Sequence, residues 1–297
     1  MAILLVILTA FLATVAASPA AATTIVKNKT ITNLKLAAGA HDRIYDGCTF
    51  KSTRSDRAVI QIDRAARNIT FRDCVIKSGK WNGISINDRY GNIHDIKFLR
   101  CKVEAQKRMG FECTSRPTST TRGYKNIKIL KCTFAPQGSE AISFDGGPGC
   151  VNNVVDRTVI KGAGTNRAFP WGQGFECNGP RKMRFTNNKV YQCRGSLLNL
   201  QMHTTASSGW VIEDNTLDAS KHYQSVPMGA TSQVIIASNV YGGSFRDNYV
   251  RAAKPGGGVA WFGNCHDMVW TGTTWKDSRG GSHARPMQQQ GCSGNRL

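Results

Sequence analysis

Three acidic residues occupy related positions in short segments near the middle of the chain. Glu112 and Glu176 lie in the closely similar segments GFECT (110–114) and GFECN (174–178), and Asp145 ends a comparable segment between them. Each segment alternates apolar and polar residues, which is typical of a strand with one buried face. Carboxyl groups on the outer face of neighbouring strands raise one another's pKa, as a general acid requires. These three residues are therefore our candidate catalytic residues.

Two chemistries suit this group of carboxylates. A pair on adjacent strands would fall within the roughly 6.5–9.5 Å that separates the two carboxyl groups of an inverting glycosidase. The same three residues, Glu112, Asp145 and Glu176, could instead hold Ca²⁺, which takes several carboxylate and carbonyl oxygens. In a polysaccharide lyase, Ca²⁺ or an arginine would neutralise the uronate of the substrate, and a basic side chain would remove the neighbouring proton.

Basic, amide and aromatic residues flank the three segments. Arg108 precedes Glu112, and His203 follows the next copy of the segment, so both are further candidate catalytic residues. Trp171 offers a flat apolar platform on which a sugar could stack. The candidate substrate-binding residues on this face and beside it are Lys107, Arg116, Trp171, Arg181, Lys182, Asn199, Gln201, Asp63 and Asn87.

A repeated strand must position these residues. Copies of the alternating segment occur at 59–63, 83–87, 110–114, 141–145, 174–178, 197–201, 234–238 and 259–263. The alternation predicts an inward column of Ile60, Ile84, Phe111, Ile142, Phe175 and Leu198. It predicts an outward column of Gln61, Ser85, Glu112, Ser143, Glu176 and Asn199. The outward column would form a flat polar wall suited to an extended polymer.

A second motif recurs through the chain: a large apolar residue, two variable residues, a Cys or small polar residue, a variable residue and an apolar residue. Clear copies are 71–76, 98–103, 129–134, 185–190, 212–217 and 245–250. The Cys or small polar position, called here the ladder column, is Cys48, Cys74, Cys101, Cys132, Thr158, Asn188, Asn215, Asn248 and Thr273, in steps of 25 to 33 residues. Such a period without helical periodicity predicts a solenoid of stacked β-coils.

With these columns the sequence resembles the right-handed parallel β-helix proteins of the pectate-lyase-like superfamily, over roughly residues 25–277. The ladder column is similar to the stack of small polar residues that those proteins place at a coil corner. The resemblance implies an all-β, right-handed parallel β-helix of about nine to ten coils. The fold hosts lyases, hydrolases, epimerases, tailspikes and adhesins, and no specific family motif is matched, so the resemblance does not define an activity.

The ladder cysteines have two interpretations. Stacked coils lie about 4.8 Å apart, which brings neighbouring ladder residues within disulfide range. Cys48 with Cys74 and Cys101 with Cys132 could form disulfides, or all four could be buried thiols. Cys113 and Cys177 lie two coils apart and are too distant to bridge. Cys265 and Cys292 could connect the C-terminal tail to the last coil.

Composition indicates an exported protein with an anionic partner. An apolar run over residues 3–17, followed by small residues, predicts a signal peptide at 1–22, a β-helix domain at 23–277 and a tail at 278–297. After signal removal no stable membrane span is expected, and the protein would be secreted, either extracellular or periplasmic. Net charge is +20, which favours a polyanion. Export makes an acidic polysaccharide the expected partner and nucleic acid an unlikely one.

The leading hypothesis is therefore a secreted polysaccharide lyase that acts on a uronic-acid polymer. The first alternative is a glycoside hydrolase that uses the paired carboxylates, as in tailspike endoglycosidases. The second is a non-catalytic, polysaccharide-binding surface protein. Ca²⁺ is the only cofactor that the residues imply.

Overall fold

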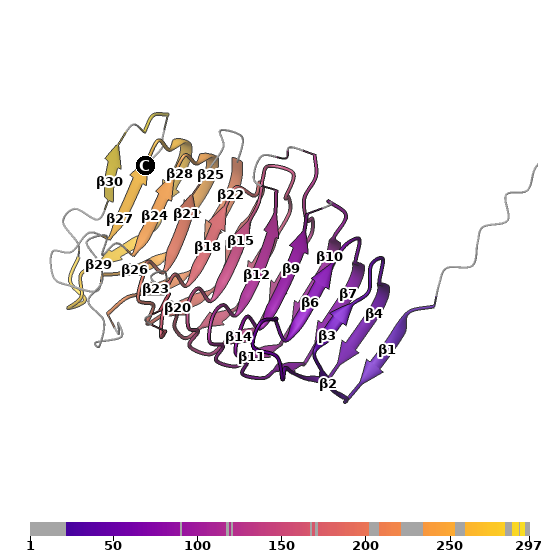
Figure 1. The fold of residues 1–297 in the computed structure, drawn as a ribbon. Helices are drawn as coiled ribbons and strands as arrows, with labels where there is room; N and C mark the ends of the chain where they lie inside the picture. Colours follow the sequence, from indigo (N-terminus) through magenta and orange to yellow (C-terminus); the bar gives the residue numbers. More distant parts are fainter. Residues whose placement is uncertain are drawn as a thin grey trace, which may run out of the picture.

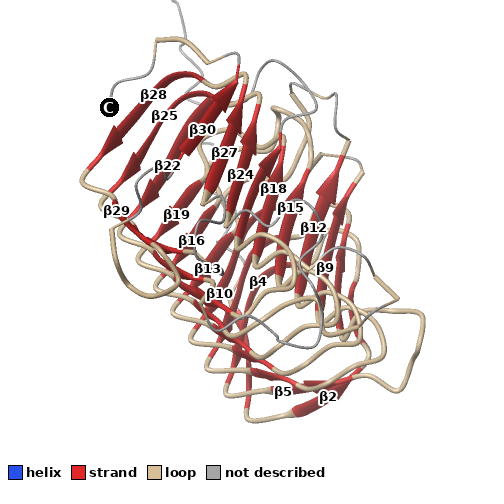
Figure 2. Cartoon of the chain, turned by 90° about the vertical axis from the view of Figure 1, so that its left-hand side faces the viewer, coloured by secondary structure: helices blue, strands red, loops and turns tan. Residues whose placement is uncertain are grey.

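The computed structural model describes residues 22–89, 91–116, 119, 121–166, 168–169, 172–201, 208–220, 234–252, 259–282, 287–290 and 292–294. Over these residues the chain winds as a right-handed parallel β-helix of three sheets (Figure 1). Figure 2 shows strands and loops but no helix in the described part of the chain. No helix there is long and apolar enough to cross a membrane.

Each turn of the solenoid contributes one strand to each sheet. Sheet A consists of β1 (Thr24–Lys27), β4 (His41–Asp46), β7 (Arg67–Arg72), β10 (His94–Leu99), β13 (Lys128–Leu130), β16 (Val154–Asp156), β19 (Arg184–Thr186), β22 (Ser208–Glu213), β25 (Tyr241–Arg246) and β28 (His266–Thr271). Sheet B consists of β2 (Thr30–Thr32), β5 (Thr49–Lys51), β8 (Val75–Ile76), β11 (Lys102–Val103), β14 (Thr133–Phe134), β17 (Val159–Ile160), β20 (Lys189–Tyr191), β23 (Thr216–Asp218), β26 (Tyr249–Arg251) and β29 (Thr274–Lys276).

Sheet C carries the segments that contain the candidate site. It consists of β3 (Leu34–Leu36), β6 (Ile60–Asp63), β9 (Ile84–Asp88), β12 (Phe111–Ser115), β15 (Ile142–Asp145), β18 (Phe175–Asn178), β21 (Leu198–Gln201), β24 (Ile235–Ser238), β27 (Ala260–Gly263) and β30 (Met287–Gln290). With ten strands per sheet, the expected nine to ten coils are close to the structure. Strand β30 pairs with β27, so the sheet extends past residue 277 into the segment that we expected to be only a tail.

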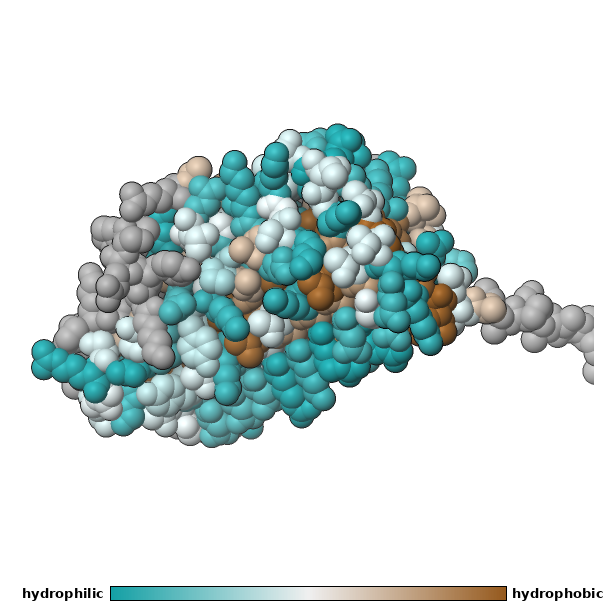
Figure 3. All heavy atoms as spheres, turned by 90° about the horizontal axis from the view of Figure 1, so that it is seen from below, coloured by the Kyte–Doolittle hydropathy of each residue, from teal (hydrophilic) through white to brown (hydrophobic). Residues whose placement is uncertain are grey.

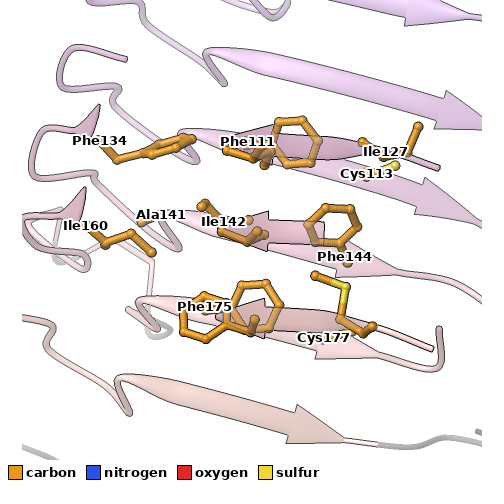
Figure 4. Packing of buried hydrophobic residues seen from close by; sticks show 14 of the residues in the cluster. Phe111, Cys113, Ile127, Phe134, Ala141, Ile142, Phe144, Ile160, Phe175 and Cys177 are labelled. Atoms are coloured by element: carbon orange, nitrogen blue, oxygen red, sulfur yellow. The ribbon is translucent and has the colours of Figure 1, made fainter. Parts of the chain in front are cut away.

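The inward column of sheet C is confirmed by the pairing register. Ile60, Ile84, Phe111, Ile142, Phe175 and Leu198 are Cα partners in successive strands, and all are buried. In Figure 4 the side chains of Phe111, Ile142 and Phe175 lie above one another inside the coils. Most outward side chains of sheets A and B are partly or fully exposed, whereas Ser143 and Asn199 in the outward column of sheet C are buried. The face in Figure 3 is largely hydrophilic with a few hydrophobic patches.

The corner between sheets A and B is formed by one residue with positive φ in each coil. These residues are Asn28, Gly47, Asp73, Arg100, Lys131, Arg157, Asn187, Asp214, Asp247 and Gly272, with φ from 50° to 64°. In every coil except the first, the residue that follows the positive-φ residue belongs to the ladder column. In the second half of the ladder the Asn188 backbone N–H donates to Asn215 Oδ1 at 2.9 Å, and that of Asn215 donates to Asn248 Oδ1 at 3.0 Å. At this corner the chain changes direction, so its buried backbone groups have no strand partner. The asparagine side chains bind these groups and so connect each coil to the next.

In the first half of the ladder, cysteine takes the same place as a free thiol. Cys74 Sγ donates to the backbone oxygen of Tyr45 at 3.4 Å, and Cys101 N–H donates to Cys132 Sγ at 3.4 Å. The four ladder cysteines Cys48, Cys74, Cys101 and Cys132 are free and buried in the structure. Of the two interpretations, the structure therefore supports the ladder of buried thiols.

Replacing Ile142 by Asp tests the inward column. The side chain is fully buried, so the change places an unpaired carboxylate in an apolar interior and should cost more than about 3 kcal/mol in the free energy of unfolding. Lys102→Asp is the control, because Lys102 is exposed on sheet B and a surface change costs about 0.5 kcal/mol or less. Urea denaturation measures both, and equal stability of the two variants would contradict the assignment of the faces.

Candidate functional site

The outer face of sheet C brings two of the three predicted carboxylates into one register. Glu112 on β12 pairs with Ser143 on β15, which pairs with Glu176 on β18. Two strand spacings put the backbones of the two glutamates about 10 Å apart. Asp145 lies on the strand between them, two residues further along, opposite Thr114 and Asn178.

Glu112 contacts groups from its own coil and from the preceding coil. Its Oε2 accepts hydrogen bonds from Asn82 Nδ2 at 2.7 Å and from Ser85 Oγ at 3.3 Å. Arg108 Nη2 lies 3.9 Å from its Oε1, and the Glu112 side chain is only 18 % exposed. The Arg108 guanidinium is itself stacked 4.7 Å above the ring centre of Trp81, which fixes the cation beside the carboxylate.

Glu176 is surrounded by neutral polar groups instead of a cation. Its Oε2 accepts a hydrogen bond from Ser143 Oγ at 3.0 Å, and Asn199 Nδ2 lies 3.5 Å from its Oε1. Asn178, on the same strand, provides another side-chain hydrogen bond. Because all of these groups are neutral, no positive charge in direct contact stabilises the ionised form of Glu176 among the described residues.

A third carboxylate, Glu140, lies between the two and was missed by the sequence reasoning. It precedes β15 by two residues, is 2 % exposed, and accepts a hydrogen bond from Ser139 Oγ at 2.5 Å. Its charge acts on both Glu112 and Glu176. Asn82 precedes β9 by the same two residues and contacts Glu112. In these two coils the residue two positions before the strand therefore acts at the outer wall, which the alternating pattern of the sequence does not reveal.

The pKa values of Glu112 and Glu176 are both raised. Burial is the main cause for both, and the negative charge of Glu140 adds to it. For Glu112 the nearby Arg108 and the hydrogen bonds from Ser85 and Asn82 oppose the rise. For Glu176 the charge of Asp145 raises the pKa further. Carboxyl groups with raised pKa retain a proton closer to neutral pH, which is the property of a general acid.

Several buried polar atoms around Glu176 have no hydrogen-bond partner. They are Gln173 Oε1, Asn178 Oδ1, Ser196 Oγ and Asn199 Oδ1. Each such atom costs about 1–3 kcal/mol when it stays unsatisfied. Three of the four are amide oxygens, which accept hydrogen bonds from hydroxyl groups. All four atoms are closed off from solvent, so they belong to the packed polar layer beside Glu176 and are not open to a ligand in this conformation.

A second column of predicted residues lies beside the carboxylates. Asp63, Asn87, Thr114, Asp145, Asn178 and Gln201 are Cα partners on successive strands. Toward the N-terminus this column enters a groove of about 720 Å³ lined by Lys35, Gln61, Asp63, Arg64, Asn87 and Arg89. An adjoining hollow shares Asn87 and Arg89 and includes Arg116. The groove thus brings cations to the same face as the carboxylates.

The other predicted residues are not all on this face. Lys107 is exposed just before β12, and Arg181 Nε donates to the backbone oxygen of Pro148 at 2.6 Å. Lys182 lines a hollow on sheet A, so its expected place beside Glu176 is wrong: the chain has already turned the corner after β18. His203 and Trp171 lie outside the described residues.

Ca²⁺ was the cofactor predicted for Glu112, Asp145 and Glu176, and it takes several carboxylate and carbonyl oxygens. Within the described ranges, no group of three or more His, Cys, Asp or Glu side chains could hold a metal ion. Ca²⁺ therefore has no part in the chemistry derived below, and its presence stays a prediction.

Comparison with solved structures identifies the fold. The A-module of mannuronan C-5 epimerase AlgE4 from Azotobacter vinelandii matches with a TM-score of 0.53 and 12 % identity, covering 93 % of this chain and 87 % of that chain. The tailspike receptor-binding domain of Siphovirus 9NA matches with a TM-score of 0.50 and 10 % identity, covering 91 % and 52 %. No protein-family model and no curated protein sequence matches the chain. These likenesses show the fold alone: the chain is a parallel β-helix.

Stability as a function of pH tests the environment of Glu176. Burial raises its pKa in the folded protein, so the folded state holds this proton more tightly than the unfolded chain. Below the pKa that Glu176 has in the unfolded chain, its protonated form contributes its full stability. This contribution is lost as the pH rises through the pKa of Glu176 in the folded protein. Glu176→Gln should therefore raise the Tm at about pH 8 and change it little at about pH 4.

Glu104→Gln is the control with the opposite sign. Lys77 lies 3.0 Å from the Glu104 carboxylate and lowers its pKa, so its stability is present above the unfolded pKa and lost as pH falls. Removing this charge should lower the Tm at neutral pH. If Glu176→Gln also lowers the Tm at neutral pH, the surroundings of Glu176 do not destabilise its ionised form, and the prediction is wrong.

Proposed function

We propose that this protein cleaves an acidic polysaccharide by acid–base hydrolysis on the outer face of sheet C. The observation that carries the proposal is the group formed by Glu112, Glu140 and Glu176, in which burial and mutual repulsion raise the pKa of the two outer carboxyl groups. Glycoside hydrolysis uses two carboxyl groups, one protonated and one ionised. Environments that separate the pKa values of two such groups assign their roles.

The surroundings favour Glu176 as the acid and Glu112 as the base. Glu176 is near two further carboxylates, Glu140 and Asp145, which favour its protonated form. Glu112 is near Arg108, which favours its ionised form. The protonated Glu176 would donate to the glycosidic oxygen as that bond breaks, and ionised Glu112 would remove a proton from the attacking water. Two strand spacings put their backbones roughly 10 Å apart, and inverting enzymes hold their two carboxyl groups about 6.5–9.5 Å apart.

The charge of the protein supports an anionic substrate. Net charge is +20, and the groove that leads toward Glu112 contains Lys35, Arg64, Arg89 and Arg116. Two proteins with a similar fold are named as a mannuronan epimerase and a tailspike receptor-binding domain, which is compatible with a carbohydrate ligand. We further propose that the protein is exported, as the N-terminal sequence predicts.

A lyase is the second candidate, and Arg108 favours it. A cation 3.9 Å from Glu112 could neutralise the carboxylate of a bound uronate, so that the adjacent C–H bond becomes acidic enough for a base to remove the proton. The products separate the two reactions. A lyase product contains a new C=C bond that absorbs in the near ultraviolet, whereas a hydrolase product shows only a new reducing end.

Single substitutions test the proposed roles. On a polymer that the parent protein cleaves, Glu112→Gln and Glu176→Gln should each lower kcat at least about 100-fold, since a general acid or base contributes about 10²–10⁴-fold. The substitution Glu213→Gln on sheet A is the control, because Glu213 lies on another face. Reducing-end release measures the rate, and circular dichroism checks that each variant is folded.

The pH dependence of kcat/KM provides the second part of this test. Raised pKa values predict that activity declines as pH rises and the acid loses its proton. Glu112→Gln should abolish the acidic limb and Glu176→Gln the alkaline limb of the residual activity. Retention of full activity by both variants would place the reaction elsewhere. Loss of activity on treatment with EDTA, restored by Ca²⁺, would overturn the metal-free mechanism.

A further inference from the structure

Sheet A carries a second groove, on a different face from the carboxylates. It crosses four consecutive coils, from β13 through β16 and β19 to β22, and has a volume of about 400 Å³. Its charged lining residues are Lys128, Lys182 and Arg184, and no carboxylate lines it. All three cations are exposed. The groove is therefore an open, positively charged channel that runs along the solenoid axis.

The cations of this groove lack the ion pairs that some basic residues of the preceding coils form. On the N-terminal strands of sheet A and at its corner, basic residues are paired with acids: Arg72 with Asp46 at 2.6 Å, and Arg100 with Asp73 at 2.6 Å. Among the described residues, Lys128, Lys182 and Arg184 form no ion pair within 4.0 Å. The three groove cations thus have no ion-pair compensation, and Lys97, the register partner of Lys128 in the preceding coil, continues this uncompensated positive charge.

The nearest acids already have other partners. Asp95, whose pKa Lys128 helps to lower, accepts hydrogen bonds from His94 at 2.6 Å and from Asn126 Nδ2 at 3.0 Å. Asp156 accepts hydrogen bonds from Thr186 Oγ1 at 2.8 Å and from Asn187 Nδ2 at 2.9 Å. Neither carboxylate lines the groove, so the charged side chains that a ligand in the groove would contact are the three cations.

The remaining lining residues match the other parts of a sugar. Val154 and Val211 share one register with Lys128 and Arg184, so apolar and charged side chains alternate along the floor. Asn126 and Asn152 lie beside them in the neighbouring column. Valine methyl groups suit the C–H face of a pyranose ring, amides suit hydroxyls, and Lys or Arg suit carboxylates. The repeat of about 4.8 Å along the axis presents these groups in series.

We propose that the sheet A groove is a second binding site for an acidic polysaccharide, separate from the reacting site on sheet C. The choice of polymer rests on the proposed function, because the ligand class is the same. The second site would hold another segment of the polymer, or another chain, and so keep the protein on an insoluble or very long substrate. It uses no residue of the carboxylate group.

The experiment compares two double variants with the same change of charge. Lys128→Glu with Arg184→Glu reverses the groove, and Lys161→Glu with Lys189→Glu makes the same change on the exposed side of sheet B. Affinity electrophoresis through gels that contain polygalacturonate, alginate, hyaluronan or neutral dextran gives apparent Kd values. The groove variant should bind the acidic polymer retained by the parent at least about tenfold more weakly, and the control within about threefold. Dextran should retain none of them.

Activity on short oligosaccharides separates this proposal from the proposed function. Hydrolysis of a soluble fragment should be unchanged in the groove variant, while retention on the long polymer is lost. Equal weakening in both double variants would show that only net charge matters and would overturn the proposal. Parent protein that is retained by single-stranded DNA but by no acidic polysaccharide would also overturn it. If the parent cleaves nothing yet the groove variant alone loses retention, the proposed function fails and the groove assignment stands.

Discussion

The in-register stacking of parallel coils is the constraint on which the rest of this structure depends. Each strand hydrogen-bonds to its equivalent in the coil before and the coil after, so a residue type that recurs at one position becomes a column. A slip of one residue would transfer Ile142 and its partners to solvent and the acidic wall to the interior. The core, the ladder and the candidate site are therefore determined together.

Two features of the corners maintain this register. The single positive-φ residue between sheets A and B bends each coil at the same place, although at eight of the ten positions it is not glycine. The buried ladder then binds the corners of neighbouring coils to one another, through asparagine amides in one half and cysteine thiols in the other. Because a thiol is a weaker hydrogen-bonding group than an amide, the two halves of the solenoid connect their corners with unequal strength.

The sequence was sufficient to predict the fold and only part of the site. The columns of Ile60 to Leu198 and of Cys48 to Asn248 are periodic, so period alone predicts them. Glu140 was missed because the repeat was taken to start at the residue after it, and its role depends on how the chain enters β15. Lys182 was placed on the wrong face because a corner follows β18. The disulfide alternatives could not be separated from spacing, since thiols and disulfides both fit adjacent coils.

Stacking also restricts the distances that this molecule can place between functional groups. Residues in one column are separated by whole multiples of about 4.8 Å. Small backbone shifts therefore cannot change the distance between Glu112 and Glu176 gradually. Intermediate distances arise where a side chain from another column acts at the site, as that of Glu140 does from the position before its strand. Insertion or loss of a whole coil would change the gap by a full step. A solenoid of this type can therefore change the geometry of its site only in discrete steps, with side-chain length as the fine adjustment.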